Sequence, residues 1–226
     1  MKHLIETAGL SGLPITEYDR IILDSDTDEI VYRGGGINAN GHSYVDLGLP
    51  SRLKWAKCNV GAEKETDYGD YFMWGSTKPN TADEFSWANA PFNGGAETFD
   101  EDYFTAHKSE WLDDNDNLKL EYDAARVNMG GDWRMPTKDD FDELLRNTKL
   151  KFLNGGGYYG LKCTSKTDET KYIFISAGKN YDDGYFWSSS LNDSDPRNAW
   201  CLWFSQIQID INNYIRTSSY PVRGVL

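Results

Sequence analysis

The chain has 226 residues and a formal net charge of −13, with 39% hydrophobic and 14% aromatic residues. A chain of this length can bury a sizeable core without disulfide bonds, and its apolar content excludes intrinsic disorder. The negative charge makes nucleic acid and anionic membranes poor partners, because binding to either depends largely on cationic side chains. We expect one large domain, or one domain with a small appendage.

The cysteines, Cys58, Cys163 and Cys201, are odd in number and widely spaced. This is typical of neither a disulfide framework nor a zinc site, and whether one pair forms a bridge is left open. No apolar run is long enough for a transmembrane helix, and residues 1–19 lack the apolar core of a Sec signal peptide. The location stays unknown, with a virion or export by another route as the expectation.

The N-terminal segment differs in its residue pattern from the rest of the chain. Two apolar runs, 19–24 and 29–33, flank turn-forming residues and predict a β-hairpin. The stretch 34–41, rich in glycine and asparagine, predicts a linker. We therefore expect residues 1–38 to be an attachment segment, through which the chain could form an oligomer, and residues 39–226 to be the main domain.

Two segments of the main domain predict helices. Residues 123–129 end at Gly130, a typical C-terminal stop. Residues 137–146 begin with Thr137, whose hydroxyl can cap the first turn, and place Phe141 and Leu144 on one face.

The last part of the chain predicts strands. Trp200, Leu202 and Phe204 alternate with Cys201, Trp203 and Ser205, and three isoleucines between 207 and 211 alternate with Gln208 and Asp210. This period of two indicates a hairpin of half-buried strands. Together with the helices, it predicts the α+β class, with short antiparallel strands and long loops.

Catalytic and metal-binding patterns are weak. His107 is the only histidine far into the main domain, and we expect it in an exposed loop. The acidic run 113–117 lacks the glycine and glutamate of a calcium loop and predicts a solvated turn. The glycine runs 34–36 and 155–157 lack the lysine of a phosphate-binding loop. We expect no catalytic residue, no cofactor and no metal.

The tryptophans divide into two groups. Trp55, Trp74, Trp133, Trp187 and Trp200 have apolar neighbours and are expected in the core. Trp203 points to the opposite side of its strand from Trp200. With Tyr214 and Tyr220 it would form an exposed apolar patch of the kind that marks an interaction surface. The alternative, that another segment covers this side, is equally compatible with the pattern.

Several strings, in a fixed order, carry a family resemblance. They are 41–51 (GHSYVDLGLPS), 53–61 (LKWAKCNVG), 67–75 (DYGDYFMWG), 131–137 (GDWRMPT), 186–190 (FWSSS), 198–200 (NAW) and 221–223 (PVR). The chain from about residue 40 resembles lectin-like domains of gut bacteria and their phages. The resemblance implies a C-type lectin fold, in the version shared with formylglycine-generating enzymes.

The C-terminal segment is similar to the variable region of diversity-generating retroelement proteins. This resemblance implies a non-catalytic protein that binds a protein or glycan on a target cell surface, displayed on a phage tail or a cell as an adhesin. The implied scaffold is Trp200, Leu202, Phe204, Ile209, Ile211, Arg216, Val222 and Arg223. The implied ligand-binding and variable residues are Cys201, Trp203, Ser205, Gln208, Asp210, Asn212, Tyr214, Thr217, Ser218 and Tyr220.

Two other functions remain open from the sequence. One is an enzyme related to the formylglycine-generating oxidases, although Cys201 has no second cysteine nearby to share a copper ion. The other is a structural adhesin subunit. The Glu-Pro-Asn and Gln-Pro-Asp loops of calcium-dependent lectins are absent from the chain.

Overall fold

A computed structural model of the chain describes residues 40–80, 85–155, 158–177 and 183–226. It also describes the backbone of three N-terminal strands, β1 (Lys2–Ile5), β2 (Ile21–Asp24) and β3 (Ile30–Arg33), which pair in the antiparallel order β1-β2-β3. The predicted hairpin is confirmed as β2 and β3, and β1 adds a strand that was not predicted. Most of the expected linker lies outside the described residues, so the boundary near residue 38 stays a prediction.

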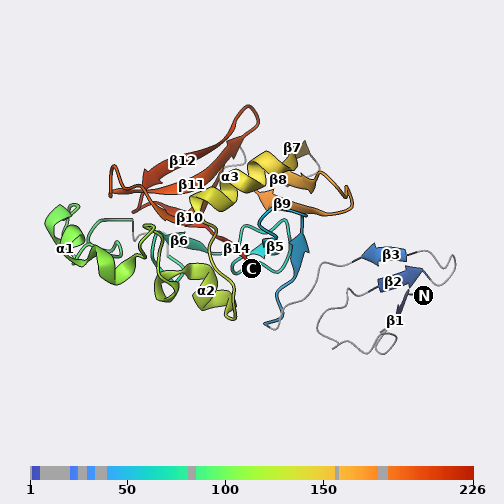
Figure 1. The fold of residues 1–226 in the computed structure, drawn as a ribbon, viewed down its shortest axis with the longest axis horizontal. Coiled ribbons are helices and arrows are strands. Elements are labelled where there is room, and N and C mark those ends of the chain that lie inside the picture. The colour runs from blue at the N-terminus through green and yellow to red at the C-terminus, as the bar shows by residue number, and fades with distance from the viewer. Residues whose placement is uncertain are drawn as a thin grey trace.

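The other described strands form four small antiparallel sheets (Figure 1). They are β14-β5-β4 (Arg223–Val225, Lys54–Asn59, Tyr44–Asp46), β13-β6 (Ser219–Pro221, Tyr71–Met73), β7-β8-β9 (Thr148–Gly155, Tyr158–Ser165, Tyr172–Ser176) and β10-β11-β12 (Asp183–Leu191, Asn198–Ser205, Ile209–Ile215). Because β13 and β14 pair with β6 and β5, the last strands of the chain are built into sheets with early strands of the main domain.

The described helices are α1 (Glu101–Trp111), α2 (Ala124–Met129) and α3 (Lys138–Asn147), with a 3-10 helix at Leu120–Tyr122. The two predicted helices are confirmed as α2 and α3. Asp123 caps α2 by accepting from the N–H of Arg126, and Gly130 ends it with a φ of 69°. Helix α1 was not predicted, because its two buried residues, Phe104 and Trp111, are too few to give a helical pattern.

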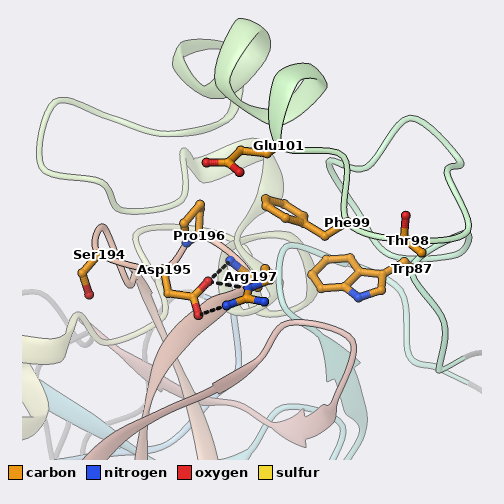
Figure 2. Close-up of a pocket in the computed structure, with 8 residues that line it drawn as sticks. All are labelled: Trp87, Thr98, Phe99, Glu101, Ser194, Asp195, Pro196 and Arg197. Atoms are coloured by element: carbon orange, nitrogen blue, oxygen red, sulfur yellow. Dashed lines mark hydrogen bonds and ion pairs between the residues drawn. The ribbon is translucent and has the colours of Figure 1, made fainter.

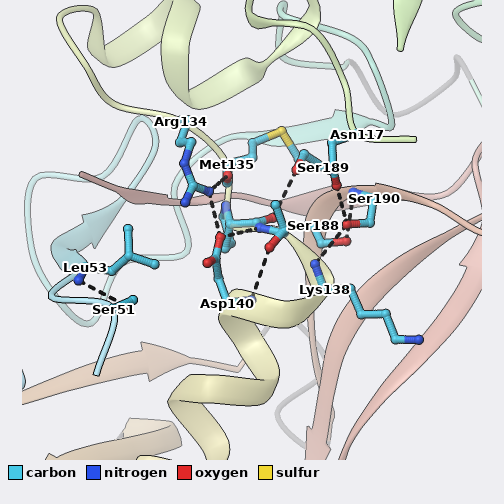
Figure 3. Close-up of polar contacts among 12 residues, drawn as sticks. Ser51, Leu53, Asn117, Arg134, Met135, Lys138, Asp140, Ser188, Ser189 and Ser190 are labelled. Carbon is cyan, nitrogen blue, oxygen red and sulfur yellow. Dashed lines mark hydrogen bonds and ion pairs between the residues drawn. The ribbon is translucent and has the colours of Figure 1, made fainter. Parts of the chain in front are cut away.

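The first turn of α3 is held by local and distant contacts (Figure 3). The hydroxyl of Thr137 accepts from the N–H of Asp140, and the Asp140 carboxylate accepts from the N–H of Thr137. The Arg134 guanidinium donates to the same carboxylate at 2.6 Å. The N–H of Lys138 donates to the hydroxyl of Ser190 at 2.9 Å, which ties the helix to β10. The capping box predicts the helix start from sequence, but the link to β10 depends on the fold.

The predicted fold class, α+β with a C-type lectin fold, is wrong for this chain. Strands dominate the described residues, the three α-helices are short, and the strands are spread over small antiparallel sheets. The physical reason is that each α-helix buries only two or three residues, whereas the strands contribute more residues to the hydrophobic core. The fold is mostly β.

The sheet β10-β11-β12 separates two hydrophobic clusters. Trp187, Ala199 and Cys201 belong to one cluster, which also holds Trp74 and Trp133. Phe186, Leu202 and Phe204 belong to the other, which includes Trp55 and residues of α3. Four of the five tryptophans predicted in the core are fully buried, and Trp200 is only half-buried, which corrects that prediction. Among the described residues, no helix is both long and apolar enough to cross a membrane.

Candidate binding surface

The strand register brings most of the predicted ligand-binding positions to one side of the sheet. Trp203 lies between Tyr185 of β10 and Asp210 of β12, and Cys201 lies between Trp187 and Asn212. Directly paired residues of antiparallel strands point to the same side. We call the outer part of this side the aromatic face. It consists of Asp183, Tyr185, Trp203, Asp210, Asn212 and Tyr214, with Tyr220 of β13.

Three tyrosines at the aromatic face hold one another in place. The rings of Tyr185 and Tyr220 stack with centroids 4.8 Å apart. The Tyr214 ring stands at right angles to both, at 5.0 Å from Tyr185 and 6.0 Å from Tyr220. The Tyr220 ring also contacts the buried Trp187 ring, with centroids 4.6 Å apart. All three tyrosines are half-buried, so each presents part of its surface to solvent from a fixed position.

Burial also controls the charge of these rings. It raises the pKa of Tyr220 to about 12, and it raises the pKa values of Tyr185 and Tyr214. For Tyr185 the nearby Tyr214 and the carboxylate of Asp183 act in the same direction. The Tyr185 hydroxyl lies 3.5 Å from an Asp183 oxygen. The three hydroxyls therefore stay protonated at neutral pH and keep their hydrogen-bond donors.

Two of the predicted ligand-binding residues are buried. Cys201 is 0% exposed in the core, where burial raises the pKa of its thiol. Ser205 is also buried, and its hydroxyl accepts from the N–H groups of Ile207 and Gln208 in the turn after β11. The alternation assigned both side chains to the correct side, but Trp187 and the turn cover them. The expectation that both side chains are accessible on the surface is wrong.

The structure places the other predicted positions as follows. Gln208, Asp210 and Asn212 are exposed, and Trp203, Tyr214, Thr217, Ser218 and Tyr220 are half-buried. Of the implied scaffold, Leu202, Phe204, Arg216, Val222 and Arg223 are buried, whereas Trp200, Ile209 and Ile211 are half-buried. The expected contrast between a buried scaffold and an accessible surface is therefore present only in part.

The outer edge of the sheet is closed by its own side chains. Strand β12 pairs only with β11 in the described sheet. The carboxylate of Asp210 accepts from the N–H of Ile211, and the amide oxygen of Asn212 accepts from the N–H of Asn213, both at 2.8 Å. These bonds occupy backbone donors that a neighbouring strand could otherwise use. The exposed acids and amides of the aromatic face thus also protect its edge.

The structure corrects one expectation about the catalytic and metal-binding candidates, the position of His107. His107 lies on α1 and not in a loop, and its ring packs against Tyr103 and Trp111 at centroid distances of 4.4 and 5.9 Å. The acidic run is a turn, as predicted, in which Asp113 accepts from the N–H groups of Asn115 and Asn117. The three cysteines are free, and the described residues contain no cluster of His, Cys, Asp or Glu able to hold a metal.

Sequence reasoning missed Asp183 and Tyr185. The signal was present, because Tyr185 and Trp187 alternate with Gly184 and Phe186 along β10. The predicted site did not include this alternation, because it was confined to the last strands of the chain.

No family model, no curated protein and no solved structure matches the chain. The resemblance noted above therefore depends on the sequence strings alone.

Proposed function

We propose that the chain is a non-catalytic binding protein that contacts a partner protein through its aromatic face. The observation that carries the proposal is the interlocked set of Tyr185, Tyr214 and Tyr220 beside the exposed Asp210 and Asn212. Tyrosine and tryptophan are the residues most enriched at energetically important positions of protein interfaces.

Preorganisation favours this role. The three rings contact one another, so binding would restrict few additional rotamers and lose little conformational entropy. The exposed Asp210 and Asn212 supply adaptable polar contacts around the rings, an arrangement that resembles antibody binding surfaces.

The charge of the face suggests the nature of the partner. Asp183 and Asp210 lie on the same side of the sheet as the rings, and the chain carries a net charge of −13. A basic patch on the partner would complement these carboxylates and speed association. The resemblance to variable proteins supports a partner on the surface of a target cell, and sequence variation at the accessible positions would follow from that role.

Binding to a panel of intact gut bacteria, measured by flow cytometry with the fluorescently labelled chain, tests the proposal. Tyr214→Ala should reduce binding by at least about tenfold, because it removes the central ring of the cluster. Tyr172→Ala is the matched control, because Tyr172 is an exposed tyrosine of β9, outside the aromatic face. Protease treatment of the cells should abolish binding, and periodate oxidation of their glycans should not. Equal binding by the two variants would contradict the proposal.

A further inference from the structure

A pocket of about 710 Å³ is lined by residues outside the aromatic face (Figure 2). Its wall comes from two loops: residues before α1 contribute Trp87, Thr98 and Phe99, and the loop between β10 and β11 contributes Ser194, Asp195, Pro196 and Arg197. Glu101, in the first turn of α1, completes the rim. The volume lies in the range of small-molecule sites.

One buried amide organises the aromatic side of the pocket. Asn93 is 0% exposed, and its side-chain nitrogen donates to the carbonyl oxygens of Trp87, Ala96 and Thr98 at 2.9–3.0 Å. Its oxygen accepts from the N–H of Asp100. The loop is therefore closed around one side chain, and the rings of Trp87 and Phe99 meet with centroids 5.1 Å apart.

The polar side of the pocket contains an ion pair. The Arg197 guanidinium donates two hydrogen bonds of 2.8 Å to the carboxylate of Asp195. Asn198 donates to the same carboxylate at 3.1 Å. Figure 2 shows this pair beside the rings of Phe99 and Trp87. The pair presents donors and acceptors side by side, and the hydroxyls of Thr98 and Ser194 add further groups of both kinds.

A buried arginine lies beneath the rings. Arg216 is 0% exposed, and its guanidinium carbon is 5.3 Å from the Trp87 ring centroid and 5.6 Å from that of Phe99. It donates to the carbonyl oxygens of Pro196 and Pro91, which joins the loops on both sides of the pocket. Burial lowers the pKa of Arg216 to about 9, so it is still a cation at neutral pH.

Charged groups of both signs surround the pocket. Arg216 and Arg197 carry two positive charges, and Asp195 and Glu101 carry two negative charges. A cationic ligand on the rings would be repelled by the positive charge of Arg216, which already interacts with the negative faces of the same rings. An anionic ligand would approach two carboxylates. A neutral molecule meets neither of these repulsions.

We infer that this pocket is a second binding site, which takes a neutral saccharide. A pyranose ring has an apolar C–H face that can lie on the Trp87 and Phe99 rings. Its hydroxyls both donate and accept, which matches the mixed donors and acceptors of Asp195, Arg197 and Glu101. The site is made of different residues from the aromatic face, so each proposal can fail without the other.

A printed array of neutral and acidic oligosaccharides, probed with the labelled chain, tests the inference. Wild type should bind neutral glycans, and Thr98→Arg should reduce that signal by about tenfold or more, because the longer side chain occupies part of the pocket and keeps the contacts of Arg216 with the rings and the two carbonyl oxygens. Thr170→Arg is the matched control, with the same charge change at an exposed residue outside the pocket. Tyr214→Ala should bind the array as wild type does.

Trp87 provides a second comparison. Trp87→Ala removes the platform and should abolish binding, whereas Trp87→Phe keeps an aromatic ring and should retain most of it. The inference is overturned if wild type binds no neutral glycan, if it binds only acidic glycans, or if Thr98→Arg binds like Thr170→Arg.

Discussion

The ammonium group of Lys138 lies 3.6 Å from the centre of the Trp200 ring, so the first residue of α3 covers a tryptophan of β11. A cation over an indole face adds electrostatic attraction and removes the ring from part of the solvent. Trp200 is therefore held at the surface by a side chain from another element, and not enclosed in a core.

We predict that Trp133 and Trp200 differ in their contribution to stability. Trp133 is 0% exposed, so Trp133→Ala should lower the free energy of unfolding by about 3–5 kcal/mol. Trp200→Ala should cost less, about 1–2 kcal/mol, because the ring is half-buried. Urea unfolding followed by circular dichroism measures both. Equal losses at the two positions would show that Trp200 is a core residue after all.

The loop closed by Asn93 gives a second prediction. Asn93→Ala leaves the carbonyl oxygens of Trp87, Ala96 and Thr98 without this donor, and we expect a loss of about 1–3 kcal/mol in urea unfolding. Asn89→Ala, at an exposed residue of the same loop, should stay within about 0.5 kcal/mol of wild type. A wild-type stability for Asn93→Ala would mean that the loop closes without it.

Alkaline pH should weaken the fold through Tyr220. Burial raises the pKa of Tyr220 from 10.0 to about 12, so the folded state keeps this proton when the unfolded state loses it. The resulting stability is fully present below pH 10 and is lost as the pH rises from 10 towards 12. Tyr220→Phe has no such proton. The difference in unfolding free energy between wild type and Tyr220→Phe should shrink over this range, and a constant difference would exclude the effect.

When the side-chain hydrogen bonds along the edge of β12 are removed, this edge should pair with strands of other copies of the chain. In Asp210→Ala/Asn212→Ala the N–H groups of Ile211 and Asn213 lose their acceptors and can pair with another strand. We expect concentration-dependent dimers or aggregates in sedimentation velocity, while wild type shows no such species from this edge. Gln208→Ala, at an exposed residue of the preceding turn, is the control. A double variant that sediments like this control would rule out edge protection.

Calcium and chelators should not change the stability of the chain. The described residues contain no cluster of metal-binding side chains, and the acidic run folds as a turn through its own hydrogen bonds. Thermal unfolding in the presence of calcium and after addition of EDTA should give the same midpoint. A midpoint raised by several degrees with calcium, and lowered again by EDTA, would reveal a metal site.

The sequence by itself determined the elements whose signals are local. Helices α2 and α3 were predictable because Asp123 and Thr137 cap them within their own first turns. The alternation from Trp200 to Ser205 correctly predicted which side chains of β11 share a side, because successive residues of a strand point in opposite directions. Helix α1 has no such pattern and was missed.

Only the tertiary structure decided which side chains cover each side of the sheet β10-β11-β12. Cys201 is buried in the same cluster as Trp187, against which Tyr220 packs, and Trp200 is half-buried with the Lys138 ammonium over its ring. The pocket joins loops about one hundred residues apart, linked by the bonds of Arg216 to Pro91 and Pro196. Periodicity within a strand carries no information about such distant neighbours, so the strand positions were predictable and their exposure was not.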